Sequence, residues 1–191
     1  GSSAPDLALD HLDGLADLTR WRGRSLWHPA VQAAAADGRP IFAVCAGLQV
    51  LGHTFRAHGN EVEGIGLLDV TTAPLERRAT GELVSEPTRA GVTAELSQPL
   101  TGFENHMGAT ALGPDASALG RVTRGVGNGG NERVDGVVQG SVIATYMHGP
   151  ALARNPQLAD LLIARALDIP LAELEPLELD AVTKLREERL R

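Results

Sequence analysis

The segment around residue 45 constrains this chain most, because an apolar β-type run there gives way at once to a helical pattern. The run is Ile41-Phe42-Ala43-Val44, and it ends at Cys45, the only cysteine among the 191 residues. Two small residues, Ala46 and Gly47, follow directly, as a tight turn beside a reactive side chain requires. The pattern predicts a strand–turn–helix elbow, with Cys45 at the carboxyl end of a strand and a helix over residues 46–58.

An elbow of this kind has chemical consequences for Cys45. The N-terminus of a helix carries partial positive charge and free N–H groups, which favour a thiolate and can hold an oxyanion. The alternative is that Cys45 is a small buried hydrophobic residue at a strand end, as most free cysteines are. The elbow, together with the motifs further along the chain, favours a nucleophile over an inert core residue.

Composition excludes several classes of function. The net charge is −7 and the chain has no basic stripe, which argues against a nucleic-acid partner. A single cysteine cannot form an internal disulfide, which favours a reducing compartment, so we expect a cytoplasmic protein. No apolar run approaches the roughly 18 residues of a membrane span, and no signal peptide is visible. No phosphate-binding Gly-x-x-x-x-Gly-Lys-Ser/Thr motif occurs, and we expect neither a cofactor nor a metal.

The order of the remaining patterns indicates an α/β protein with one mixed sheet. Helices are expected over residues 4–20, 30–36, 155–167 and 171–191, whereas residues 21–29 are expected to be irregular. The last helix is expected to be amphipathic and to pack on the body, the alternative being that it meets a partner. Strands are expected at residues 41–44, within 64–72 after a turn, and at 92–96, 119–123, 135–139 and 141–146. The glycine-rich residues 125–131 are predicted to be a flexible hairpin loop rather than a phosphate cradle, because no helix follows directly.

A cysteine nucleophile needs a base for its proton, or a cation that holds it as a thiolate. His148 is the best candidate among six histidines, because it follows the apolar run at 141–146 and precedes Gly149-Pro150. The carboxyl ends of parallel strands converge on one crevice, so two strand-end residues far apart in the chain can meet there. A lone histidine at a strand end is more often structural or solvent-facing, but beside an elbow cysteine we expect it to serve as the base.

Four ordered segments together resemble the class I, triad-type glutamine amidotransferases, in their cobyric-acid-synthase-like branch. They are Val44-Cys45-Ala46-Gly47-Leu48-Gln49-Val50-Leu51-Gly52, Gly64-Ile65-Gly66-Leu67-Leu68-Asp69-Val70-Thr71-Thr72, Gly102-Phe103-Glu104-Asn105-His106-Met107-Gly108 and Thr145-Tyr146-Met147-His148-Gly149-Pro150. The third segment, and the Asn155-Pro156-Gln157 that follows the fourth, are most similar to the glutaminase subunits of lipid II isoglutaminyl synthases. The resemblance covers about residues 40–168. It implies a flavodoxin-like mixed sheet flanked by helices, in a single amidotransferase domain over residues 1–191.

The resemblance also implies a glutaminase mechanism that these residues can perform. Cys45 attacks the side-chain amide carbon of L-glutamine, and His148 passes a proton to the departing ammonia and then activates water against the thioester. The backbone N–H of Ala46 is expected to donate to the oxyanion, an interaction worth roughly 3 kcal/mol in other enzymes. Gln49 and Arg78 match substrate-binding positions, and the arginine would pair with the carboxylate of glutamine. The alternative for Arg78 is a solvated surface side chain.

Two departures from the family pattern leave parts of this mechanism open. Many class I enzymes carry an acid two residues after the histidine, where this chain has Pro150. Either a Cys–His dyad suffices or an acid arrives from elsewhere; Glu104 is one candidate, but it and its neighbours Asn105 and His106 could instead be structural or serve a partner interface. Family members also begin with further strands and a glycine-rich loop that supplies a second oxyanion donor. That loop is not found here, so Gly1 marks either a tag remnant or the start of a fragment without those strands.

Three functions compete at this point. The first is a glutaminase subunit that supplies ammonia to a MurT-like, ATP-binding Mur ligase subunit, which amidates the D-glutamate of the lipid II stem peptide. Because the chain has no ATP-binding motif, the acceptor chemistry would belong to that other chain. The second is the glutaminase part of a cobyric-acid-type amidotransferase, against which Asn105 and Pro150 argue. The third is a non-catalytic, amidotransferase-like binding module, which the two departures favour.

Overall fold

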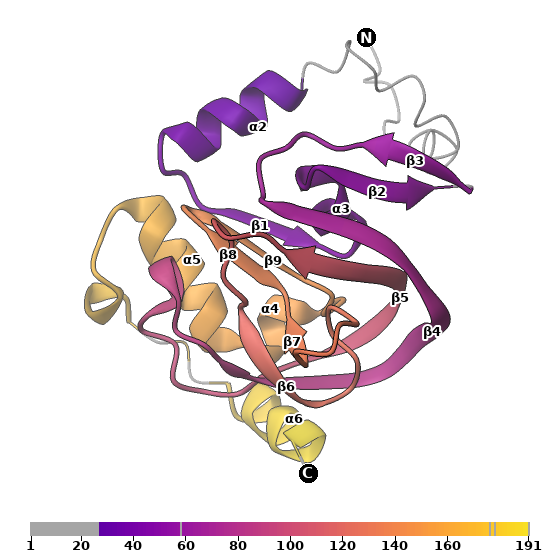
Figure 1. The fold of residues 1–191 in the computed structure, drawn as a ribbon. Coiled ribbons are helices and arrows are strands. Elements are labelled where there is room, and N and C mark those ends of the chain that lie inside the picture. The colour runs from indigo at the N-terminus through magenta and orange to yellow at the C-terminus, as the bar shows by residue number, and fades with distance from the viewer. Residues whose placement is uncertain (1–26, 58, 176, 178, 191) are drawn as a thin grey trace, which may run out of the picture.

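The computed structural model describes residues 27–57, 59–175, 177 and 179–190 (Figure 1). Within these ranges the predicted α/β class is confirmed. The helices are α2 (Trp27–Ala36), α3 (Ala46–Leu51), α4 (Ala151–Arg154), α5 (Pro156–Leu167) and α6 (Asp180–Leu190), with short 3-10 turns η2 (Gly91–Thr93) and η3 (Leu171–Glu173). The strands are β1 (Ile41–Val44), β2 (Thr54–Ala57), β3 (Asn60–Glu63), β4 (Val70–Pro87), β5 (Leu100–Leu112), β6 (Gly120–Arg124), β7 (Val134–Asp135), β8 (Val137–Gln139) and β9 (Val142–Thr145). Of the helices in these ranges, none is long and apolar enough to cross a membrane.

These strands form two hydrogen-bonded sheets, where the sequence predicts one. The smaller sheet has the order β1-β9-β8, with β1 parallel and β8 antiparallel to β9. The larger sheet has the order β3-β2-β4-β6-β7, and β5 pairs with β4 as a long curved ribbon (Figure 1). The long antiparallel β4–β5 pairing satisfies the backbone groups of both strands mostly within the larger sheet, which explains the division. An isolated bridge between Phe103 of β5 and His148 connects the two sheets just beyond β9.

The central strand of the smaller sheet, β9, lies in the hydrophobic core. All four of its residues are buried, and the same core cluster contains Leu48 of α3 and Leu161 of α5. Burying one leucine of this kind contributes roughly 1.5–3 kcal/mol. Because β1 pairs with β9 in register, with Val44 opposite Thr145, this packing fixes where both strands end.

The predicted helix over residues 46–58 is wrong beyond the end of α3. Gly52 is extended (φ −75°, ψ −169°), and the chain then forms β2, which pairs antiparallel with β3. A Cβ added at Gly52 would lie 2.7 Å from a methyl carbon of Val70, so the backbone passes directly against β4 at this point. Phe55 is buried and Arg56 is exposed, which is the two-residue alternation of a strand.

Two further local predictions are wrong. Residues 92–96 do not form a strand; instead η2 is stabilised by Thr93, whose hydroxyl donates to the carbonyl of Ala90 (2.7 Å). Residues 27–29, expected to be irregular, belong to the helix α2, whereas the rest of that expectation, residues 21–26, lies outside the described residues. Pro29 is compatible with that helix because the N–H groups of a first turn have no intrahelical partner.

The C-terminal segment is only partly helical. The helix expected over residues 171–191 is reduced to η3 and α6, and the chain is extended at Leu174 (φ −81°, ψ 121°). The expectation that this segment packs on the body is confirmed, because Arg186 donates to the carbonyl of Arg154 (2.6 Å) and α6 contacts α4 and β5. The helix expected over residues 4–20 lies outside the described residues.

The remaining expected elements occur close to their predicted positions, and the β-region is larger than predicted. The helices expected at 30–36 and 155–167 and the strands at 119–123, 135–139 and 141–146 are confirmed by α2, α5, β6, β7, β8 and β9. The sequence reading missed β5, although its alternation of buried and exposed residues is that of a strand. The predicted flexible loop at 125–131 is instead held to the body: Gly127 and Asn128 are buried, and Gly127 N–H donates to the carboxylate of Glu104 (2.8 Å).

Candidate active site

The elbow predicted at Cys45 is present. Cys45 immediately precedes α3 and has a left-handed backbone conformation (φ 53°, ψ −107°), which costs a non-glycine residue of order 1–3 kcal/mol. Its N–H donates to the carbonyl of Thr145 at the end of β9 (2.9 Å). The thiol is therefore held at a strained strand end, beside the parallel strand that leads to His148.

The environment of the thiol sets its protonation. Burial raises the pKa of Cys45 above its ordinary value, whereas a hydrogen bond from the Ala46 N–H and the positive charge of Arg78 lower it. Burial is the largest of these effects, so Cys45 rests as a thiol at neutral pH. A thiol in this state needs a base when it attacks an electrophile.

Cys45 opens into a pocket of about 220 Å³ between α3, β2, β4 and β5. The lining residues are Cys45, Gln49, Arg56, Thr72, Ala73, Pro74, His106, Met107 and Gly108. Among these lining residues, only Arg56 has a side chain that stays charged at any ordinary pH. The sequence reading did not select this residue. A cationic, amide-bearing pocket beside a thiol suits a small substrate that carries both a carboxylate and an amide.

The floor of this pocket is a chain of hydrogen bonds. Gln49 donates its amide to the hydroxyl of Tyr146 (3.2 Å), and that hydroxyl bonds the hydroxyl of Thr110 (2.7 Å). Gly108 must remain a glycine for this floor to exist, because an added Cβ would lie 2.4 Å from the Gln49 amide nitrogen and 2.5 Å from the Tyr146 oxygen. Gln49 is thus oriented by the protein, and its amide faces the pocket that contains Cys45.

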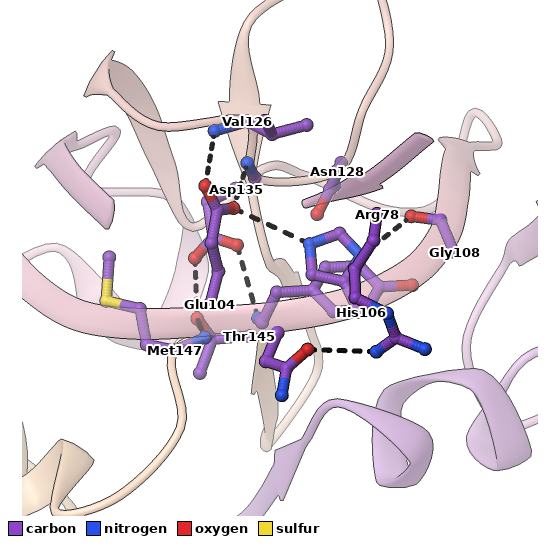
Figure 2. Close-up of polar contacts among 12 residues, drawn as sticks. Arg78, Glu104, His106, Gly108, Val126, Asn128, Asp135, Thr145 and Met147 are labelled. Atoms are coloured by element: carbon purple, nitrogen blue, oxygen red, sulfur yellow. Dashed lines mark hydrogen bonds and ion pairs between the residues drawn. The ribbon is translucent and has the colours of Figure 1, made fainter. Parts of the chain in front are cut away.

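Arg78 lies on an irregular part of β4. The pairing of β4 with β5 shifts register between Pro74 and Ala79, and the irregularity leaves Arg78 exposed. Its guanidinium donates to the side-chain oxygen of Asn105 (2.9 Å), as Figure 2 shows. The same charge lowers the pKa of Cys45, so Arg78 and the thiol are electrostatic neighbours. Substrate binding by Arg78 stays a prediction, and so does the alternative of a solvated side chain, because Arg78 is exposed and is not among the residues that line the pocket.

His148 follows β9 and is half-buried. Its N–H donates to the carbonyl of Phe103 on β5 (2.8 Å), which fixes the backbone at this residue. Burial and then the nearby positive charge of His106 lower the pKa of His148 below its ordinary value. A neutral imidazole at neutral pH can accept a proton, as a base must. Among the described residues its Nε2 has no hydrogen-bond partner, and no hydrogen bond joins it to Cys45, although the two residues follow adjacent parallel strands.

A buried ion pair lies behind the pocket (Figure 2). The carboxylate of Glu104 accepts the N–H groups of Val126 and Gly127 (both 2.8 Å) and lies 3.5 Å from Nε2 of His106. The other ring nitrogen, Nδ1, is 3.0 Å from the carbonyl of Gly108. Both ring nitrogens of His106 therefore face oxygen atoms of β5, Nδ1 at hydrogen-bond distance and Nε2 at ion-pair distance.

The His106 ring also stacks on Tyr146, with ring centroids 3.8 Å apart. The contacts of Glu104 are with His106 and the 125–131 loop, and those of Asn105 are with Arg78. A role for Glu104 as the third catalytic residue stays a prediction, because its carboxylate is engaged away from His148.

Sequence reading missed a second buried acid. Asp135 on β7 is fully buried, accepts the hydroxyl of Thr145 (2.5 Å) and the N–H of Tyr146 (3.2 Å), and lies near Glu104 (Figure 2). Burial above all, and then the charge of Glu104, raise its pKa to about 6. The sequence signal that could have identified this group is the acidic residue at the start of the expected strand at 135–139. No group of three or more acidic, histidine or cysteine side chains in the described ranges could hold a metal.

Fold and site together define a class I-type amidotransferase domain with a cysteine elbow. Residues 15–156 match the CobB/CobQ-like glutamine amidotransferase domain, and the chain belongs to this family. The resemblance seen in the sequence motifs is thereby confirmed.

Individual relatives refine this assignment. The chain is 35% identical over 151 residues to the lipid II isoglutaminyl synthase (glutamine-hydrolyzing) subunit GatD of Staphylococcus aureus, which covers 78% of this chain and 58% of that protein. It is 34% identical over 129 residues to GatD of Streptococcus pneumoniae, covering 66% and 47%. A cobyric acid synthase of Pelotomaculum thermopropionicum is 39% identical over 132 residues, covering 63% and 25%. The chain thus spans about half the length of the GatD proteins that it matches.

Solved structures agree on the fold. PurLQS from Thermotoga maritima superposes with a TM-score of 0.53 at 18% identity, over 81% of this chain and 71% of that one. A glutamine amidotransferase superposes with a TM-score of 0.51 at 20% identity, over 73% and 67%. At these identities the likeness concerns the fold alone, and it confirms the predicted amidotransferase-like α/β architecture.

Proposed function

We propose that this chain is a glutaminase subunit that hydrolyses L-glutamine through a Cys45 thioester and supplies ammonia to a MurT-like, ATP-dependent ligase. That ligase would amidate the D-glutamate of the lipid II stem peptide. The observation that carries the proposal is the strained Cys45 elbow in the wall of a pocket that also contains the Gln49 amide and the Arg56 guanidinium. The similarity to two GatD subunits supports the choice of acceptor.

The proposed first half-reaction begins with Cys45 as a thiol and His148 as a neutral base. The proton of Sγ moves to the imidazole as sulfur bonds to the side-chain amide carbon of glutamine. The carbonyl oxygen becomes an oxyanion, and the N–H of Ala46, which already points at the sulfur, is the nearest donor for it. The imidazolium then gives its proton to the amide nitrogen, the C–N bond breaks, and ammonia leaves a thioester.

In the second half-reaction His148 accepts a proton from water as the water oxygen attacks the thioester carbon. The C–S bond breaks, the proton returns to sulfur, and glutamate leaves with Cys45 restored as a thiol. Arg78 and Arg56 would hold the carboxylate of the substrate, and Gln49 would orient its polar groups. We expect a hydrogen bond between Cys45 and His148, which is absent among the described contacts, to form when glutamine or the ligase subunit binds, since catalytic hydrogen bonds are often long in unliganded sites.

Ammonia and glutamate release from L-glutamine tests the proposal, with and without a co-expressed MurT-like ligase. Cys45→Ala is the diagnostic variant, and Asp115→Asn, at an exposed position away from the pocket, is the control. We expect release that Cys45→Ala abolishes and the control retains. Unchanged turnover in Cys45→Ala would refute the thioester mechanism, and absence of release under both conditions would favour a non-catalytic module.

A second acceptor is favoured by one finding, the similarity to the cobyric acid synthase of Pelotomaculum thermopropionicum. In that case the same glutaminase would serve a corrinoid carboxylate. The two acceptors are separated by supplying each synthase partner with labelled glutamine and following nitrogen into lipid II or into the corrinoid. Transfer to the corrinoid alone would replace the lipid II assignment and leave the glutaminase intact.

A further inference from the structure

One residue of β9 ties together the backbone at both proposed catalytic side chains. The carbonyl of Thr145 accepts the N–H of Cys45 (2.9 Å), and its hydroxyl accepts the N–H of Met147 (3.0 Å), the residue before His148. Thr145 itself is buried. Any rotation of this residue therefore displaces the nucleophile and the base in a correlated way.

Asp135 holds Thr145 in place. One carboxylate oxygen accepts the Thr145 hydroxyl (2.5 Å), and the other accepts the N–H of Tyr146 (3.2 Å), as drawn in Figure 2. The hydroxyl can therefore point its hydrogen only at Asp135, and its lone pair is available to Met147. The carboxylate thus sets the direction of both hydrogen bonds in the series that runs from Met147 through the Thr145 hydroxyl to Asp135.

The backbone that carries Asp135 is itself rigid. The next residue, Gly136, has φ +71°, and an added Cβ there would lie 2.4 Å from the carbonyl oxygen of Ala144. The side chain of Asn128 clamps Gly136 from both sides, with its oxygen accepting the Gly136 N–H (2.8 Å) and its amide donating to the Gly136 carbonyl (3.0 Å). Asp135 is thereby delivered to β9 by backbone that cannot shift without losing buried hydrogen bonds.

The charged surroundings of Asp135 come from β5. The charge of Glu104 raises the pKa of Asp135, and the charge interaction with His106 lowers it. The strand paired with β7, β6, places Gly120 opposite Asp135 and adds no charge at that position. Besides the hydrogen bonds from Thr145 and Tyr146, only these two β5 groups act on the charge of Asp135 among the described residues.

We propose that Asp135 is a positioning residue for the Cys45–His148 pair, acting through the hydroxyl and carbonyl of Thr145. Protonation of Asp135 disrupts this role, because both its oxygens face donors and the added proton displaces either the Thr145 hydroxyl or the Tyr146 N–H. The protonation state of the Asp135 carboxyl thus affects the placement of both Cys45 and His148. The kinetic test of this inference rests on the proposed glutaminase function. Its second test, alkylation of the Cys45 thiol, does not.

The test uses Asp135→Asn and Thr145→Val, which keep side-chain volume but remove the carboxylate and the hydroxyl respectively. Matched controls are Asp115→Asn and Thr123→Val, both at exposed positions. Glutamine turnover is measured from pH 5 to 9 in the presence of the ligase subunit, and each variant's folding is followed by circular dichroism.

We expect kcat to fall about 10- to 100-fold in Asp135→Asn and Thr145→Val, with KM within about two-fold of wild type, since a displaced nucleophile affects the chemical step. In the wild type two groups, His148 and Asp135, contribute to the acid limb of log(kcat/KM), so its slope exceeds 1; in Asp135→Asn the slope becomes 1. A folded Asp135→Asn protein with wild-type kcat and a wild-type acid limb would overturn the inference.

Alkylation of Cys45 by iodoacetamide separates this inference from the proposed function. We expect a rate at pH 7 about 3- to 10-fold slower in both variants, because a loosened elbow weakens the hydrogen bond from Ala46 that favours the thiolate. If the wild type releases no ammonia, the glutaminase proposal fails while this rate still decides the role of Asp135. Alkylation rates equal to wild type in both folded variants would refute positioning through Thr145.

Discussion

The buried carboxyl of Asp135 predicts a specific pH dependence of stability. Its pKa is about 6 in the folded protein against an ordinary value of 3.8, because burial disfavours the carboxylate. At about 1.36 kcal/mol per pKa unit, this difference corresponds to about 3 kcal/mol. A site that holds a carboxylate at this cost is consistent with a functional role.

The direction of this pH dependence follows from the number of protons bound to Asp135 in the folded and unfolded states. Between pH 3.8 and about 6 the folded state binds more protons at Asp135 than the unfolded state, so the free energy of unfolding falls as pH rises. The contribution is fully present below pH 3.8 and is lost above about pH 6. Asp135→Asn removes this group, and the contributions of titrating groups that do not interact with Asp135 cancel in the difference between the two proteins.

Urea unfolding of wild type and Asp135→Asn at intervals from pH 4 to 8 measures that difference. We expect the free energy of unfolding of the wild type, relative to the variant, to decline by about 2 kcal/mol between pH 4 and pH 7 and to be level above pH 7, since the rest of the difference is expressed only below pH 4. Asp115→Asn, at an exposed position, should show no such decline. A difference between wild type and Asp135→Asn that does not vary with pH would refute the reasoning about burial.

Three further predictions concern the pocket and the groups around it. Glu104→Gln breaks the buried ion pair and should destabilise the fold by about 3–5 kcal/mol. In calorimetry this corresponds to a Tm lower by roughly 6–20 °C, whereas Glu132→Gln, at an exposed position, should leave Tm nearly unchanged. Gly108→Ala should reduce kcat/KM for glutamine about 10- to 100-fold, because its Cβ meets the amide that forms the pocket floor, while Gly130→Ala, which has open space, should be neutral; equal effects would contradict the fit. In Asp135→Asn, the acid limb of kcat/KM should reflect His148 and have its midpoint below pH 6.5, since burial lowers its pKa; a midpoint above 6.5 would exclude it as the neutral base.

The elbow illustrates what local sequence can predict. A strand end, a small residue and a glycine around Cys45 are contiguous, so their geometry depends on neighbouring dihedral angles and little else. The strand before His148 was predictable for the same reason, from a short apolar run. The helix after Cys45 was overestimated because residues 54–57 pair with β3, a tertiary contact that overrides helical propensity.

The walls of the pocket illustrate what local sequence cannot predict. Arg56 reaches the pocket only because β2 follows α3 at once, and it was read as part of a helix. His106 reaches it because β5 pairs with β4 over a long register that includes a shift between Pro74 and Ala79. A one-residue change in such a register would turn every side chain to the other face, so no single-strand pattern fixes the outcome.

By itself, the sequence determined the candidate nucleophile Cys45, the elbow around it, the strand-end histidine and the family, because each depends on residues adjacent in the chain or on ordered motifs. Only the tertiary structure decided the charge environment. The ion pair of Glu104 with His106, and the hold of Asp135 on Thr145, join strands that are distant in the chain. Burial changes the free energies of charged groups by kilocalories per mole, and burial is a property of the packed fold rather than of any segment.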